Sequence, residues 1–127
     1  MIKEYKLDSL GLKTTIKEIY KSTGTSADDF DLNVPFKLQY PNIAQSFNFL
    51  AISVSYGTRS NTFSTNTILM ETTMMRNYWS YMNDYYNNDS TDGIQYSCYL
   101  NHLEIRGYGN ATPTGKVHQV VGIKFEI

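Results

Sequence analysis

The most informative segment of the chain is Phe47-Asn48-Phe49-Leu50-Ala51-Ile52-Ser53-Val54-Ser55-Tyr56, because it offers apolar side chains to both faces of an extended backbone. Phe47, Phe49 and Ala51 fall on one face, and the other face carries Leu50, Ile52, Val54 and Tyr56. A strand of this kind lies inside a sheet that is covered on each side by helices, a second sheet or a neighbouring subunit. We therefore expect residues 47–56 to form the central strand.

Length and composition predict a single domain over residues 1–127. Hydrophobic residues make up 41% of the chain and charged residues only 18%, which suits contact with other protein surfaces because little charge must be desolvated. A formal charge of -1 gives no general attraction to nucleic acid or to anionic lipid. We expect protein partners, in a homo-oligomer or a multi-protein assembly, and neither nucleic acid nor membrane.

Cysteine content and the N-terminal residues indicate where the protein is made. Cys98 is the single cysteine, so the core and not an intrachain disulfide must hold the fold. The chain has no apolar run near the roughly 18 residues of a membrane span, and Met1-Ile2-Lys3-Glu4-Tyr5 does not begin a signal peptide. These features predict a soluble protein made inside the cell and not secreted by a signal peptide.

Before the central strand, the pattern predicts a helix over residues 9–22. Asp8-Ser9 is a suitable N-cap and Gly24 a suitable C-cap, and the apolar stripe consists of Leu12, Ile16, Ile19 and Tyr20. Residues 36–40 then alternate between apolar and polar side chains until Pro41, which predicts a short strand paired with the central one.

After the central strand, the Ser/Thr-rich residues up to Thr67 fit either a strand or a loop. Residues 70–86 then show helical spacing, with one face formed by Met70, Met74, Met75, Tyr78, Trp79, Met82, Tyr85 and Tyr86. Met and Tyr are common where a helix packs against a partner, because Met adapts its shape and Tyr tolerates a wet edge. We expect this helix to cover the central strand.

The last third of the chain predicts two further strands. Residues 94–100 alternate with period two, and the phase shifts near His102 before Leu103 and Ile105. Residues 107–116 (GYGNATPTGK) read as a loop, and residues 117–127 alternate again, in a strand expected to pair with the preceding one. The predicted fold class is therefore α+β, a mainly antiparallel sheet of about four strands with two helices, in the order α-β-β-α-β-β.

No catalytic set is evident, so we expect no enzymatic activity and no cofactor. An enzyme would have to use His102 and His118, with Cys98 nearby on the same strand, but a buried Cys and surface histidines explain these residues more simply.

A metal site is not expected either. Asp29, Asp31 and Asn33 imitate the start of a calcium-binding loop, but Val34 stands where Gly is needed and Tyr40 where Glu is needed.

Interface residues are expected where large or polar side chains remain exposed, on the predicted second helix, the 57–61 loop (GTRSN) and the 107–116 loop. The candidates are Tyr78, Trp79, Met82, Tyr85, Tyr86, Arg59, Tyr108 and Asn110. An alternative is a small carbohydrate- or ligand-binding module, in which Tyr85, Tyr86, Tyr96 and Tyr99 stack on the ligand.

The predicted order of elements resembles that of phage tail-terminator and tail-completion proteins. The similarity rests on the opening segment Leu12-Ile16-Ile19-Tyr20, the strand Ile52-Ser53-Val54 and the closing segment from Gly115 to Ile127. It implies a small subunit with an N-terminal helix and a mixed sheet, which forms rings at the head-proximal end of a tail. The leading hypothesis is thus a non-enzymatic structural subunit of a phage virion, a head-tail or tail component made in the host cytoplasm.

Overall fold

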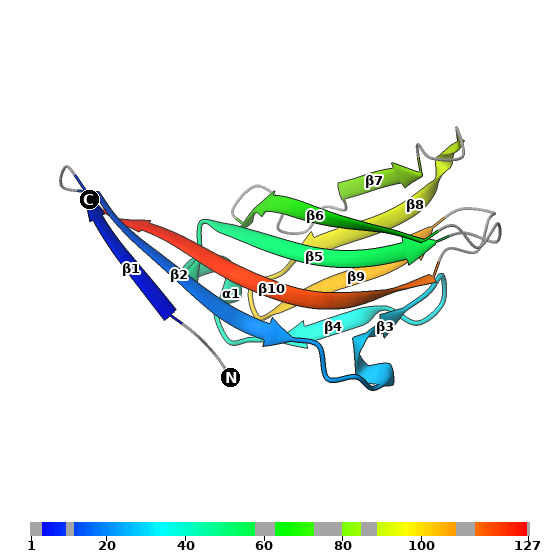
Figure 1. Ribbon diagram of the computed structural model, residues 1–127, viewed down its shortest axis with the longest axis horizontal. Helices are drawn as coiled ribbons and strands as arrows, with labels where there is room; N and C mark the ends of the chain where they lie inside the picture. The colour runs from blue at the N-terminus through cyan, green and yellow to red at the C-terminus, as the bar shows by residue number, and fades with distance from the viewer. Residues whose placement is uncertain are drawn as a thin grey trace.

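A computed structural model describes the backbone of residues 4–9, 12–57, 63–72, 80–84, 89–108 and 114–126, and the side chains of residues 13–57, 66–72, 93–107 and 114–126. The described residues form ten strands in two antiparallel sheets that pack face to face as a β-sandwich (Figure 1).

Sheet A contains six strands and sheet B four in the described part of the chain. Sheet A has the order β1-β2-β10-β5-β6, and β3 pairs with the beginning of β10. Its strands are β1 (Glu4–Ser9), β2 (Leu12–Lys21), β3 (Asp29–Phe30), β5 (Phe49–Gly57), β6 (Phe63–Glu71) and β10 (Thr114–Glu126). Sheet B has the order β4-β9-β8-β7, with β4 (Phe36–Gln39), β7 (Ser80–Asp84), β8 (Asp89–Cys98) and β9 (His102–Tyr108).

Strand β10 is the centre of sheet A, where it lies between β2 and β5 (Figure 1). Two bulges adjust its pairing. His118 is an additional residue between Val117 and Gln119 where β10 pairs with β5, and Ile19 is an additional residue of β2 opposite Val120 and Val121. Each bulge changes which side chains point to which face of the sheet.

The core lies between the two sheets. Sheet A contributes Leu50, Ile52, Val54 and Tyr56 from β5, which confirms the inner face predicted for the central strand. The other buried apolar residues include Ile19, Phe30, Phe36, Ile43, Phe47, Ile68, Met70, Ile94, Cys98, Leu103, Ile105, Val117 and Val120. Phe47 precedes β5 and turns into this core, so its predicted place on the opposite face with Phe49 and Ala51 is wrong.

A glycine of β10 is required by this core. A Cβ atom on Gly122 would lie 2.4 Å from Cδ1 of Phe47, whose ring packs against the strand at this point. Only a residue without a side chain leaves room for that ring.

The predicted α+β class is wrong, because the described residues form a β-sandwich. Apart from the short 3-10 turn η1 (Ser26–Asp28), the helix in the described part is α1 (Ile43–Ser46), which carries the chain from β4 in sheet B to β5 in sheet A. The β4 segment was predicted as a strand, but it pairs with β9 and not with the central strand.

The helix predicted over residues 9–22 is also wrong, because β2 occupies most of that segment. Thr and Ile are β-branched and favour extended backbone, and β2 pairs with both β1 and β10. The spacing of three between Ile16 and Ile19 looked helical, but Ile16 pairs with Ile123 on the outer face while Ile19 is buried in the core.

The helix predicted over residues 70–86 is wrong at Met70 and at residues 80–84, which the structure describes as strand. Met70 belongs to β6, so the Ser/Thr-rich segment before it is a strand, and Met82 lies in β7, where it pairs with Ile94. Residues 73–79 and 85–86 lie outside the described residues. In β6 and β7, pairing between strands therefore overrides the helical spacing of the Met and Tyr side chains.

The last third contains three strands where the sequence predicted two, and β8 and β10 begin inside segments predicted as loops. The phase shift near His102 is the break between β8 and β9. The closing strand β10 pairs with β2, β3 and β5 of sheet A, whereas β9 belongs to sheet B.

Candidate functional site

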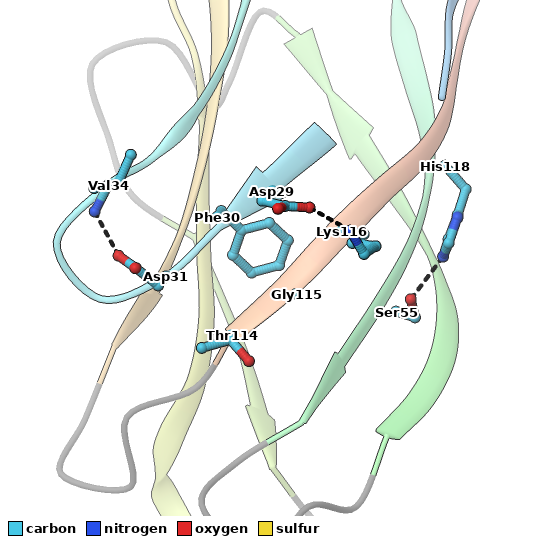
Figure 2. A pocket seen from close by; sticks show the side chains of 9 residues that line it. All are labelled: Asp29, Phe30, Asp31, Val34, Ser55, Thr114, Gly115, Lys116 and His118. Carbon is cyan, nitrogen blue, oxygen red and sulfur yellow. Dashed lines mark hydrogen bonds and ion pairs between the residues drawn. The ribbon is translucent and has the colours of Figure 1, made fainter. Parts of the chain in front are cut away.

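An open pocket of about 750 Å³ lies where β3 pairs with the beginning of β10. Figure 2 shows its lining, which comes from β3, the turn after it, β5 and β10. The lining residues are Asp29, Phe30, Asp31, Val34, Ser55, Thr114, Gly115, Lys116 and His118.

An ion pair crosses from β3 to β10 at the pocket. The Lys116 Nζ atom donates to Asp29 Oδ1 at 2.6 Å, and the two residues are paired in the sheet register. This hydrogen bond to Asp29 raises the pKa of Lys116. The pocket therefore carries an ammonium group whose charge is already matched by a carboxylate.

A serine and a histidine meet on neighbouring strands of the same pocket. Ser55 Oγ and His118 Nε2 lie 2.6 Å apart, and either atom can donate, depending on the histidine tautomer. His118 is the bulged residue of β10, and the bulge aims its ring at Ser55 of β5 (Figure 2).

Asp31 shapes the turn between β3 and β4. Its Oδ1 atom accepts hydrogen bonds from the backbone N–H groups of Asn33 at 2.7 Å and Val34 at 2.6 Å. This is an Asx-type turn, in which a side chain replaces backbone partners. It brings Val34 to the rim of the pocket (Figure 2).

Phe30 and Gly115 form the inner wall of the pocket. A Cβ atom on Gly115 would lie 2.5 Å from Phe30 Cζ and 2.5 Å from the Ser55 carbonyl oxygen, so the ring packs directly on the glycine backbone. Phe30 is buried, and it fixes β3 against β10.

A buried carboxylate holds the connector that leads into β3. Asp28 accepts hydrogen bonds from the Tyr20 hydroxyl, from the backbone N–H groups of Thr23 and Gly24, and from the Thr23 hydroxyl. Burial alone would raise the pKa of Asp28, but these hydrogen bonds outweigh it and lower the pKa to about 2. Burial and the bond to Asp28 raise the pKa of Tyr20 to about 12.

The second candidate surface is the outer face of sheet A, on the side away from sheet B. Seven apolar side chains from four neighbouring strands lie there, and we call them the apolar outer face: Ile16, Phe49, Ala51, Leu69, Val121, Ile123 and Phe125. Leu69 is 64% exposed and Phe125 is 41% exposed, while the others are half-buried.

The sheet register shows that these side chains are contiguous. Ile123 lies between Ile16 and Phe49 in one cross-strand row, and in the next row Ala51 lies between Val121 and Leu69. The rings of Phe49 and Phe125 pack edge to face, with centroids 5.9 Å apart. The surface is therefore one patch and not a set of scattered apolar residues.

The interface residues predicted from the sequence mostly fall outside the described part of the chain. Six of these residues lie outside the described part: Arg59, Tyr78, Trp79, Tyr85, Tyr86 and Asn110. Of the four tyrosines in the alternative ligand site, Tyr96 and Tyr99 are described. The backbones of Met82 and Tyr108 are described, in β7 and β9.

The histidines and the cysteine do not form one site. His118 bonds to Ser55, whereas His102 stacks on Tyr99, with ring centroids 4.5 Å apart. Cys98 is fully buried, as expected for a small core residue. Tyr96 is half-buried against the core, and burial raises its pKa.

The acidic residues that imitate the start of a calcium-binding loop have other roles in the structure. Asp29 pairs with Lys116, and Asp31 caps a turn. Across the described residues, no group of three or more His, Cys, Asp or Glu side chains is placed to hold a metal ion.

Sequence reasoning missed the two surfaces for different reasons. The apolar outer face had a visible signal, because Phe49 and Ala51 share a face of the central strand and Val121, Ile123 and Phe125 alternate in the last strand. The pocket had no such signal, because it depends on which strands become neighbours.

No protein-family model, curated protein or solved structure matches this chain. Within the described residues, no helix is both long enough and apolar enough to cross a membrane.

Proposed function

We propose that this protein is a non-enzymatic assembly subunit that acts through protein–protein contacts, with the apolar outer face as the contact surface. The observation that carries the proposal is the contiguous apolar patch across β2, β10, β5 and β6, which includes the 64%-exposed Leu69. A sheet face of this kind normally packs against another layer, and contiguous exposed apolar patches mark interaction sites.

The partner that fits best is a second copy of this chain. Two apolar sheet faces can pack at a spacing of about 10 Å, as in the sandwich itself. The net charge of -1 produces little repulsion between copies. The outer-face positions around the patch carry both signs, with Glu18 paired to Val121, Glu71 to Phe49 and Lys21 to Gln119 in the register. This mixed rim suits a copy of itself better than a strongly acidic or basic partner.

A phage virion component remains the more specific prediction, and the assembly proposal does not depend on it. The resemblance to tail-terminator proteins implies an N-terminal helix, but that part of the chain forms strand β2. The closing strand that the resemblance also used is present as β10.

Light scattering on wild-type protein and on a matched pair of variants tests the proposal. Leu69 and Leu100 are both exposed leucines, at 64% and 38%, but Leu100 lies in the turn between β8 and β9 of sheet B and not on the apolar outer face. We expect the wild type to have an oligomeric mass, Leu69→Lys to shift it toward the monomer, and Leu100→Lys to leave it unchanged. Removing one leucine side chain from water is worth about 2 kcal/mol, which corresponds to about 30-fold in affinity.

Two results would contradict the proposal. One is a monomeric wild type at the highest soluble concentration. The other is an oligomer whose mass is the same for Leu69→Lys and for wild type, which would place the contact elsewhere on the molecule.

A further inference from the structure

We propose that the pocket between β3 and the beginning of β10 binds a neutral polyhydroxylated ligand, a saccharide. This inference goes beyond the assembly function and depends on different residues. The two surfaces are separate along β5 and β10, because the polar pair Ser53–Gln119 lies between the pocket residues and the apolar outer face.

The size of the pocket fits a small ligand. Its volume of about 750 Å³ lies within the range of about 300 to 1,000 Å³ that is typical of small-molecule sites. Six of its nine lining residues carry polar side chains, which are spread around Phe30 and Gly115 from the Asp31 turn to the Ser55–His118 pair (Figure 2).

The polar groups retain both donors and acceptors beyond the bonds they make to each other. Lys116 has three N–H donors and gives one to Asp29. Whichever of Ser55 and His118 donates to the other, one N–H or O–H of the pair remains to serve a ligand. On Asp31, both hydrogen bonds that shape the turn use Oδ1, which leaves Oδ2 as an acceptor.

The charges favour hydroxyl groups over anions. Asp29 offsets the charge of Lys116, and the partners of Asp31 are backbone N–H groups, which carry no full positive charge. The two carboxylates Asp29 and Asp31 outnumber the one ammonium group of Lys116, so a phosphate or carboxylate ligand would be repelled. A vicinal pair of sugar hydroxyls can donate to a carboxylate and accept from an ammonium group without any charge of its own.

The pocket is also held rigidly enough to select a shape. Ser55, Lys116 and His118 come from paired strands, and the buried Phe30 ring fixes β3 on Gly115. Val34 is exposed and adds an apolar edge that can meet the C–H face of a sugar ring, while the buried Phe30 ring supports the wall behind it. Sites built on strands position their groups more accurately than sites on loops.

A titration followed by amide NMR signals tests this proposal. We would add a panel of neutral hexoses, N-acetylhexosamines and disaccharides to the full chain, with inorganic phosphate as the anionic comparison. For at least one saccharide we expect saturable shifts at the amides of Ser55, Gly115, Lys116 and His118, with a dissociation constant on the order of 1 mM, as small neutral ligands give. Phosphate should leave these signals unchanged.

Two variants and one control separate binding from folding. Asp31→Asn keeps an oxygen to cap the turn but loses the charged acceptor, and Ser55→Ala removes the hydroxyl; each should weaken binding at least about tenfold. Glu104→Gln makes the same kind of change as Asp31→Asn on sheet B and should bind like wild type. An unchanged signal pattern elsewhere in each spectrum shows that the variant is folded.

The assembly variant makes the two proposals distinguishable. Leu69→Lys should bind the saccharide as wild type does, whatever its mass. The saccharide proposal is overturned if no member of the panel shifts the pocket signals, if phosphate shifts them instead, or if Asp31→Asn and Ser55→Ala both bind as tightly as wild type.

Discussion

The outer faces of the two sheets differ in the kind of side chain that neighbouring strands present to each other. On sheet B, Lys37 pairs with Glu104 at 3.4 Å, and Arg106 Nε donates to Gln95 Oε1 at 2.8 Å, each between directly opposite residues. On sheet A, the corresponding rows are the apolar side chains of the apolar outer face.

This difference indicates which face leaves apolar surface in contact with water, since Leu69 and Phe125 of sheet A are exposed. On sheet B the polar side chains bond to one another across neighbouring strands, and Gln95 and Ser97 of that face are themselves buried, at 9% and 0% exposed. Apolar neighbours on sheet A gain free energy only when another surface removes them from water. The comparison therefore assigns the contact function to sheet A, whose outer face still exposes apolar side chains, and a supporting role to the described polar pairs of sheet B.

The largest effect on stability is expected on the inner side of β10, directly behind the apolar outer face. Gly122→Ala should lower the free energy of unfolding by about 2 to 3 kcal/mol, because the new methyl group collides with the Phe47 ring. Val121→Thr, one residue away on the outer side, should change it by less than about 0.5 kcal/mol in dilute protein. Urea unfolding measures both, and equal losses would contradict the assignment of faces.

A smaller loss is expected at the connector that leads β2 into β3. Asp28→Asn replaces a carboxylate that accepts bonds from Tyr20, Thr23 and Gly24 with an amide whose N–H₂ group must face some of these donors. We expect a loss of about 1 to 2 kcal/mol in the free energy of unfolding. It should be largest above pH 4.

The pH dependence follows from the lowered pKa of Asp28. Its pKa is about 2 in the folded protein, against 3.8 as the ordinary value, so its contribution is complete above the ordinary pKa. That contribution should be lost as the pH falls from about 4 through about 2. Urea unfolding across this range should show the difference between wild type and Asp28→Asn shrinking toward zero, and a constant difference would contradict the role of the charge.

The smallest effect is expected at the charged pair of sheet B. Lys37→Met removes the ion pair with Glu104, but the Lys37 side chain is 52% exposed and solvent weakens the attraction. The free energy of unfolding should change by less than about 1 kcal/mol, and the mass in solution should stay that of the wild type. A change in mass would indicate that the contact surface lies on sheet B and not on sheet A.

Several strands could be predicted from alternation in the sequence, but their partners could not. Residues 36–39, 49–56, 103–105 and 117–126 lie in strands as predicted, because period-two patterns survive in them. The helix over residues 9–22 failed because the bulge at Ile19 breaks the alternation and imitates a spacing of three. The insertion of β10 between β2 and β5 is a long-range pairing, and local patterns carry no information about it.

The two candidate surfaces were visible in the sequence to different degrees. The apolar outer face follows from the two-faced central strand, once the second face is seen to be left open. The pocket brings Ser55 and His118 together across 63 positions, through a bulge and a pairing that the sequence did not predict.

Thiol labelling on the two outer faces tests the central claim most directly. Cysteine would replace Val121 on sheet A or Lys37 on sheet B, against the background of the fully buried Cys98. The labelling rate would be measured over a range of protein concentrations. We predict that labelling of Val121→Cys slows as the concentration rises, because copies cover the apolar outer face, while the rate for Lys37→Cys stays constant. A rate for Val121→Cys that does not depend on concentration, or a slowing at Lys37→Cys instead, would contradict the claim.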